Sequence, residues 1–305
     1  MHSLRKENQN FQSSEEDSLR KWIIAIRPQT LFASISPVII GSSMAYVDHV
    51  FHLPSSLMAF FGALFIQIGT NLANDYYDFI HGVDTEERLG PLRVTQQGII
   101  KPDLVKKGFI TAFFLSAICG CYLVIRAGLP ILIIGLISIA VGIAYTAGPV
   151  PLGYIGVADL LVIIFFGPVA VAGTYYVQAL SIKKDVILAG FAPGFISNAI
   201  LVVNNLRDIE TDAQAGKKSL AVRFGKGFAR AEYLTSLLIA FIIPIFLLSK
   251  RHRLHLLCWC SFLIVIPYIK VLWQRPSPLY NQLLKKTALF LFVYSILFSA
   301  GWLIE

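Results

Sequence analysis

Long apolar runs recur along this chain, and they limit its possible folds more than any other feature. Nine runs are long enough to cross, as helices, the hydrocarbon core of a bilayer. They cover residues 22–46, 54–80, 108–126, 129–146, 157–180, 185–207, 228–248, 254–272 and 285–304. Because a membrane span must satisfy its own backbone hydrogen bonds, the sequence predicts an all-α, polytopic bundle of about nine transmembrane helices. We expect a polar N-terminal tail, residues 1–20, followed by a single transmembrane domain, residues 21–305.

Positive charge is distributed unequally between the two ends of these predicted spans. The chain has 26 Lys and Arg residues, and 20 of them fall in segments 1–27, 83–107, 207–230 and 270–286. With nine spans, these four segments lie on the same side of the membrane, and cytoplasmic loops are the ones enriched in Lys and Arg. The formal net charge of +8 therefore indicates membrane orientation, with the N-terminus in the cytoplasm. We expect contact with a lipid bilayer and no nucleic-acid partner.

Two polar stripes interrupt the apolar pattern, each at the predicted cytoplasmic end of a span. Asn71, Asn74, Asp75 and Asp78 follow the spacing i, i+3, i+4, i+7, which is one face of a helix. The second stripe contains Asn204, Asn205, Asp208 and Asp212. Charged side chains in apolar spans are costly and usually face a bundle interior or a water-filled cavity. We therefore expect the two stripes to meet across one cavity.

The residue types in the stripes favour a metal bound together with phosphate. Carboxylate and carboxamide oxygens are the ligands that Mg²⁺ prefers, and Mg²⁺ keeps positions for water and phosphate oxygens. The predicted ligands are the eight stripe residues together with Asp84 in the following loop. Nearby cations can hold phosphate groups, and the candidates are Arg93, Arg207, Lys217 and Lys218. Asp159, near the start of its span, is interpreted as a residue that only begins a helix.

A metal-bound diphosphate next to a membrane-embedded cavity predicts a prenyl diphosphate as the substrate. Mg²⁺ and the cations would stabilise the departing diphosphate, and Asp75, Asp78, Asp208 and Asp212 are the candidate catalytic residues. Aromatic rings can stabilise the allylic cation that remains. Tyr145 is one such candidate. An electron-rich acceptor would then attack this cation.

These residues resemble a known family. Asn71-x2-Asn74-Asp75-x2-Asp78 and Asn204-Asn205-x2-Asp208-x3-Asp212 look like the two Asp-rich motifs of the UbiA-type intramembrane aromatic prenyltransferases. Within that superfamily, four further stretches look most like 1,4-dihydroxy-2-naphthoate polyprenyltransferases of menaquinone synthesis. These stretches are Arg27-Pro-Gln-Thr-Leu, Gly90-Pro91-Leu92-Arg93, Tyr145-Thr-Ala-Gly-Pro and Gly216-Lys217-Lys218-Ser219-Leu220.

The resemblance implies roles for particular residues. The Asp-rich motifs would hold Mg²⁺ and diphosphate, with Asp84 joining them, and Arg27 and Tyr145 would be acceptor-binding residues. The resemblance also implies that the prenyl chain replaces the carboxylate of 1,4-dihydroxy-2-naphthoate. This reaction releases CO₂ and diphosphate and gives a demethylmenaquinone, in the cytoplasmic (inner) membrane of a bacterium.

Three alternatives remain open from the residues alone. The acceptor could instead be 4-hydroxybenzoate, haem, homogentisate or a chlorophyll precursor. A secondary transporter also uses acidic residues in broken helices, but near the bilayer midplane, whereas both stripes end their helices. A phospholipid-type alcohol phosphotransferase is disfavoured because its Asp-Gly-x2-Ala-Arg signature does not occur.

Overall fold

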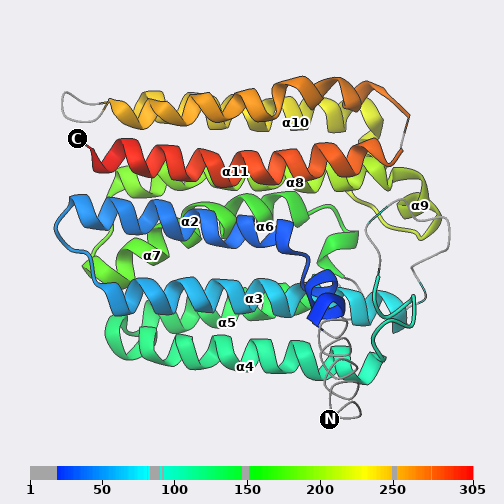
Figure 1. The fold of residues 1–305 in the computed structure, drawn as a ribbon, viewed down its shortest axis with the longest axis horizontal. Helices are drawn as coiled ribbons and strands as arrows, with labels where there is room; N and C mark the ends of the chain where they lie inside the picture. The colour runs from blue at the N-terminus through cyan, green and yellow to red at the C-terminus, as the bar shows by residue number, and fades with distance from the viewer. Residues whose placement is uncertain are drawn as a thin grey trace, which may run out of the picture.

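The computed structural model describes residues 19–80, 82, 90, 93–145, 151–248, 253–275 and 277–304. All regular elements in these ranges are helices, and most of them run side by side along one direction (Figure 1). Asp84 and residues 1–18 of the predicted tail lie outside these ranges. The architecture is the all-α bundle that the apolar runs predict.

The first half of the bundle contains a helix break that the sequence analysis does not predict. Residues 19–26 are helical, Arg27 adopts a left-handed conformation with φ 53° and ψ 72°, and α2 then runs over Pro28–Val47. The predicted span 22–46 is therefore two helical pieces, because Pro28 suits the first turn of a new helix. Helices α3 (Leu53–Ile80), α4 (Pro102–Ala127) and α5 (Leu129–Ala144) follow.

The second half begins with the short turn η1 (Leu152–Tyr154) and a composite span. That span consists of α6 (Ala158–Ile164), a π-helical turn η2 (Phe165–Val169) and α7 (Ala170–Ala179). Next come α8 (Lys184–Arg207), α9 (Ile209–Gln214) and α10 (Leu220–Phe246). The chain ends with η3 (Leu254–Ile264), η4 (Ile266–Trp273) and α11 (Leu279–Leu303).

Two of the nine predicted spans need correction. In the described ranges, seven helices are long and apolar enough to cross a membrane, or eight if η3 and η4, bent by 45°, form one span. Helix α5 has 16 residues, about 24 Å at 1.5 Å per residue, which is shorter than a hydrocarbon core of about 30 Å. The span predicted at 129–146 is too short because the helix ends before Tyr145. The span at 254–272 is bent next to Pro267, which has no N–H to donate.

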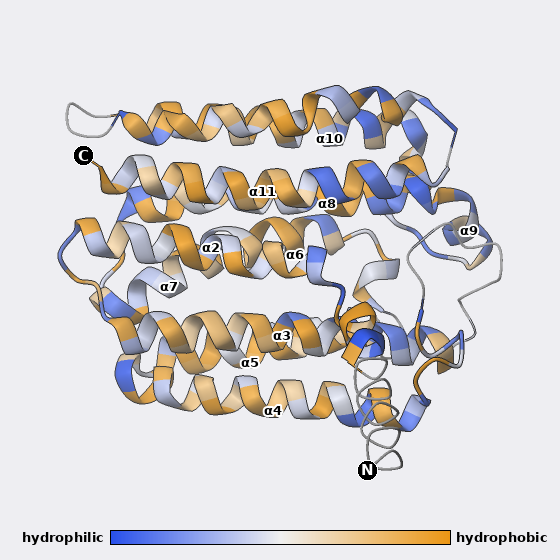
Figure 2. Ribbon diagram, viewed as in Figure 1, coloured by the Kyte–Doolittle hydropathy of each residue, from blue (hydrophilic) through white to orange (hydrophobic). Residues whose placement is uncertain are grey.

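The surface and the core both fit a multi-pass membrane protein. Large apolar side chains such as Phe114, Ile125 and Leu263 are exposed on the outside of the bundle, where lipid replaces water. The largest buried cluster joins residues of α2, α7, α8, α10, α11 and η3. Hydrophilic residues concentrate at the end of the bundle that carries α9 (Figure 2).

Helix α8 approaches the α6–η2 segment closely enough to require glycine. A Cβ atom added at Gly194 would lie 2.3 Å from the carbonyl oxygen of Ile163, and one at Gly190 would lie 2.6 Å from the Cα atom of Pro168. Small residues permit such close helix contacts inside membranes. This contact sets the position of α8, and with it the second polar stripe.

Candidate active site

Asp75 connects three separate segments of the chain. Its carboxylate is 1% exposed and accepts hydrogen bonds from the backbone N–H groups of Val94 (3.2 Å) and Thr95 (3.0 Å). The guanidinium of Arg27 lies 3.9 Å from the same carboxylate. The end of α3, the helix break at Arg27 and the turn after Arg93 are therefore fixed to one another through Asp75.

Asp78, one turn further along α3, forms an ion pair with Arg93. Both side chains are buried, so little water screens this interaction. The second carboxylate oxygen of Asp78, Oδ1, has no hydrogen-bond partner in the described part of the chain. A buried acceptor without a partner is unusual in proteins. This oxygen is available to a ligand.

Asn71, predicted as a metal ligand, is engaged in holding the helix break. Its amide nitrogen donates to the carbonyl oxygen of Ile26 and to Oγ1 of Thr30, both at 2.8 Å. These bonds provide a donor for the two oxygens, which lie on either side of Arg27, where its left-handed conformation interrupts the helix. Asn74, between the stripe's other members, is half-buried. The break places Arg27 next to Asp75 of the first stripe, whereas the sequence suggested a role toward the acceptor.

The second stripe centres on Arg207, which is 1% exposed. Its guanidinium donates to Asp208 Oδ1 (2.8 Å), to Asn204 Oδ1 (2.8 Å) and to Asn281 Oδ1 on α11 (2.7 Å). The second stripe is divided between two helices, because α8 ends at Arg207 and α9 begins at Ile209. Asp208 stands at this break as the cap of both helices. Asn205 is buried in the last turn of α8.

The two predicted lysines differ in position. Lys217 pairs with the buried Asp212 at 2.9 Å and lies 5.0 Å from the centre of the Tyr154 ring. Lys218 is exposed, and it is its backbone N–H that donates to the Tyr154 carbonyl oxygen at 2.7 Å. Lys217 therefore belongs to the group around Asp212, whereas the side chain of Lys218 is exposed.

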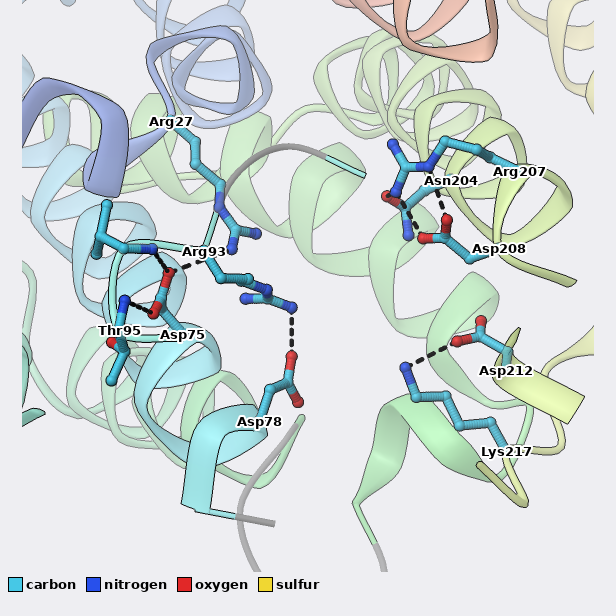
Figure 3. A network of polar contacts seen from close by, with 11 residues as sticks. Arg27, Asp75, Asp78, Arg93, Thr95, Asn204, Arg207, Asp208, Asp212 and Lys217 are labelled. Atoms are coloured by element: carbon cyan, nitrogen blue, oxygen red, sulfur yellow. Dashed lines mark hydrogen bonds and ion pairs between the residues drawn. The ribbon is translucent and has the colours of Figure 1, made fainter. Parts of the chain in front are cut away.

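Tyr145 follows the end of α5 and senses charges of both stripes. Burial raises the pKa of its phenol, and the negative charges of Asp159, Asp212 and Asp78 raise it further. The phenol therefore stays neutral at physiological pH. Carboxylates of both stripes, Asp78 and Asp212, therefore lie within electrostatic reach of Tyr145. Figure 3 shows the two groups opposite each other, with Asp78 on one side and Lys217 on the other.

Each of the four stripe aspartates has its own cation. The pairs are Asp75 with Arg27, Asp78 with Arg93, Asp208 with Arg207, and Asp212 with Lys217. In the described ranges, no group of three or more His, Cys, Asp or Glu residues forms a ready-made metal cage. Mg²⁺ commonly binds through one or two carboxylates plus substrate phosphates. The oxygen donors of the site, including the available Oδ1 of Asp78, fit Mg²⁺. Because each aspartate is paired with an Arg or Lys, the metal would bind together with an anion that pairs with those side chains in turn.

Sequence reasoning missed several residues that support this site. Asn281 on α11 accepts a hydrogen bond from Arg207. It lies outside both stripes, and no sequence pattern around it indicates this role. The backbone N–H groups of Val94 and Thr95 follow a predicted cation but carry no recognisable pattern. Tyr154 lies in η1, and nothing in the sequence around it indicates a role in the site. These contacts depend on the tertiary structure.

Comparison with known proteins gives consistent matches across the chain. Residues 34–303 match the family model described as the UbiA prenyltransferase family. A "1,4-dihydroxy-2-naphthoate octaprenyltransferase" of Haemophilus influenzae is 34% identical, covering 94% of this chain and 97% of the relative. A protein of the same name from Escherichia coli is 37% identical, covering 81% and 82%. Human "UbiA prenyltransferase domain-containing protein 1" is 28% identical, covering 91% and 81%.

Solved structures share the fold at low sequence identity. A UbiA homologue from Archaeoglobus fulgidus bound to DMAPP and Mg²⁺ has a TM-score of 0.59 at 18% identity, covering 92% of this chain and 99% of that chain. The apo structure of a UbiA homologue from Aeropyrum pernix has a TM-score of 0.63 at 13% identity, covering 90% and 97%. These similarities establish the helical architecture.

Proposed function

Because this chain belongs to the UbiA prenyltransferase family, we propose that it transfers a polyprenyl group from polyprenyl diphosphate to 1,4-dihydroxy-2-naphthoate. The products are a demethylmenaquinone in its reduced, hydroquinone form, CO₂ and diphosphate. The names of bacterial relatives at 34% and 37% identity support this acceptor. The observation that carries the proposal is the facing arrangement of the two stripes, in which every carboxylate has a cation beside it.

We assign the binding of Mg²⁺ to the aspartates of the two stripes. Asn71, Asn74, Asn204, Asn205 and Asp84 remain candidate ligands on the basis of the sequence. When bound, Mg²⁺ would act as a Lewis acid that stabilises the negative charge of the leaving diphosphate. The Archaeoglobus homologue bound to Mg²⁺ and DMAPP supports the use of a divalent metal in this fold.

The cations of the site would hold the diphosphate and neutralise its charge as the allylic C–O bond breaks. Arg93, Arg207 and Lys217 are close enough to the aspartates to do this, and Lys218 remains a more distant candidate. The donors of Arg207 are fixed before reaction, because its guanidinium is held by Asp208, Asn204 and Asn281. Preorganised charge of this kind is usually the largest contribution to catalysis.

The neutral ring of Tyr145 suits the allylic cation or the acceptor that attacks it. In the attack, a ring carbon of the acceptor forms the new C–C bond to the prenyl group. The bond from that carbon to the carboxylate then breaks, and its electron pair restores the aromatic ring. CO₂ leaves, so this exchange needs no net proton transfer.

We further propose that the protein lies in the bacterial cytoplasmic membrane, with its N-terminus and the site on the cytoplasmic side. The supporting observation is the accumulation of Lys and Arg in the segments at that end, with 20 of 26 in the N-terminal segment and three connectors. Basic connectors favour the cytoplasmic side. Prenyl diphosphate would then enter with its head group at that face.

The test is turnover by the purified full-length protein. It is incubated with Mg²⁺, a prenyl diphosphate and, separately, 1,4-dihydroxy-2-naphthoate or 4-hydroxybenzoate, and products are identified by mass spectrometry. We expect a prenylated naphthol that has lost CO₂, no product with EDTA, and recovery with excess Mg²⁺. Product from 4-hydroxybenzoate alone would overturn the acceptor. Accumulation of substrate in vesicles without a covalent product would favour a transporter.

A further inference from the structure

A second group of polar residues, two of them buried and one half-buried, lies apart from the stripes, where α8 packs against both α6 and α10. Asp159 begins α6, Asn198 lies midway along α8, and Glu232 lies on α10. The carboxyl groups of Asp159 and Glu232 contact each other. Asp159 is 4% exposed and Asn198 is 2% exposed. Acidic groups inside membrane spans are costly and are usually functional.

The hydrogen bonds of this group are incomplete. The amide nitrogen of Asn198 donates to Glu232 Oε1 (3.2 Å) and to Ser236 Oγ (3.3 Å). No donor in the described ranges satisfies Oδ1 of Asn198 or either oxygen of Asp159, and Ser197 Oγ also lacks a partner. Two adjacent carboxyl groups can share one proton, which still leaves acceptors unsatisfied. A purely structural network would rarely leave so many buried acceptors without donors.

The position of this group relates it to the active site. Asn198 and Asn205 are seven residues apart, so they lie on the same face of α8, roughly 10 Å from each other along the helix axis. Asp159 is also within electrostatic reach of the Tyr145 phenol, as are Asp78 and Asp212 of the two stripes. The group therefore borders the site on the side away from the end of the bundle that carries α9.

We propose that Asp159, Asn198 and Glu232 bind a hydroxyl group of the aromatic acceptor. The inference rests on the proposed function, since it assigns the acceptor's place within that site. The amide N–H groups of Asn198 are already used by Glu232 and Ser236, so the group has acceptor oxygens left over and no further amide donor for them. A phenolic O–H supplies a donor. The negative end of the acceptor, its carboxylate, is repelled by these acids and is drawn toward the cations of the stripes. The acceptor is thereby oriented.

This orientation has a chemical consequence for the ring. A phenolic O–H that donates to a carboxylate releases electron density into the ring, which favours attack on the allylic cation. An analogue without the hydroxyl would leave the buried acceptors unpaired. Sites built to hydrogen-bond a hydroxyl reject such analogues strongly. Asp159, Asn198 and Glu232 are therefore positioning and specificity residues.

The test compares binding of two ligands to the full-length protein loaded with Mg²⁺ and an unreactive prenyl thiodiphosphate. The ligands are 1,4-dihydroxy-2-naphthoate and 2-naphthoate, measured by isothermal titration calorimetry. We expect the wild type to prefer the dihydroxy compound by about 10- to 100-fold, the range for hydrogen bonds to charged groups. In Asp159→Asn and Glu232→Gln this preference falls toward 1, while the KM for prenyl diphosphate is unchanged.

Asp48→Asn is the matched control. Asp48 is another carboxylate within the bundle's polar network, paired with Lys183 at 2.6 Å and with the Tyr175 hydroxyl at 2.6 Å, at the opposite end of α2 from the site. This variant should keep the wild-type preference. If Asp159→Asn does not fold, Glu232→Gln on a different helix provides the same measurement.

Three results would overturn the inference. They are an absence of preference in the wild type, an unchanged preference in both folded variants, and an equal loss of affinity for both ligands. The last result would indicate a packing role. If the wild type gives no prenylated product with any acceptor, the proposed function fails instead, and the turnover assay shows this independently of the binding ratio.

Discussion

The stripe aspartates look alike in sequence but are held differently. Asp75 accepts two backbone N–H groups and lies beside Arg27, so it supports the loop after α3 as well as offering oxygens to a metal. Asp208 receives Arg207, which is also held by Asn204 and Asn281. Removal of Asp75 therefore leaves buried donors unpaired. Removal of Asp208 leaves Arg207 with Asn204 and Asn281 as acceptors.

We expect Asp75→Ala and Asp208→Ala each to lower kcat/KM by more than about 100-fold, since loss of a group that only supports a metal ligand already costs about 10- to 100-fold. Asp75→Ala should also lower Tm, because each unpaired buried N–H costs about 1–3 kcal/mol. Steady-state kinetics and thermal unfolding in detergent distinguish the two effects. Asp48→Asn serves as the control for activity. Turnover near the wild-type rate in either alanine variant would refute the metal-binding role.

At the scale of elements, the contact between α8 and the α6–η2 segment determines where the second stripe and the Asp159 group lie. Gly190 and Gly194 permit this contact, because the backbone of the facing segment occupies the space that a side chain would need. The π-helical turn at Pro168 lies in the same contact. Such turns occur often at functional sites. Here the turn shapes the backbone that α8 packs against.

We expect Gly194→Ala to lower the free energy of unfolding by about 1–3 kcal/mol, the usual cost of overpacking, because its Cβ would lie 2.3 Å from the Ile163 carbonyl oxygen. Gly173→Ala, on α7, is the matched control, since no atom lies within 4 Å of its added Cβ. It should be neutral or stabilising by about 0.5–1 kcal/mol. Thermal unfolding of both proteins measures the difference. Equal Tm values would show that the contact tolerates a side chain.

At the scale of the whole molecule, the site is assembled from two distant parts of the chain. One part is formed by the helix break, the end of α3 and the turn after Arg93, and the other by the α8–α9 junction and Lys217 (Figure 3). The four ion pairs make the combined charge of these eight side chains zero. Neither a lone cation nor a lone anion is therefore strongly attracted.

We expect Mg²⁺ and diphosphate to bind synergistically. Mg²⁺ would bind the aspartates and release their Arg and Lys partners for diphosphate, and diphosphate would bind the Arg and Lys side chains and release the aspartates for Mg²⁺. Titration calorimetry should show at least about 10-fold tighter Mg²⁺ binding with inorganic diphosphate present, within the usual range of coupling between ligands. The effect of Mg²⁺ on diphosphate affinity should be the same. Lys226→Ala, which removes a surface pair with Glu210, should leave the coupling intact. Independent binding would contradict the exchange of ion pairs.

The helical membrane fold and the two polar stripes can be predicted from the amino-acid sequence. Both rest on local information, namely the length of apolar runs, the i, i+3, i+4 spacing that places the first stripe on one face of a helix, and the cluster of polar residues that ends the apolar run before the second stripe. Most span boundaries follow from the same information, as α3 and α8 illustrate. The family resemblance depended on these same local motifs.

Only the tertiary structure decided which groups meet. The helix break at Arg27 is held by Asn71, 44 positions further along the chain, and Arg207 is held by Asn281 from another helix. Asp159 begins a helix, as its sequence context indicates, yet its contact with Glu232 depends on how α6, α8 and α10 pack. Periodicity defines the face that a helix presents. The partner of that face is set by packing between helices, and this packing involves residues far apart in sequence.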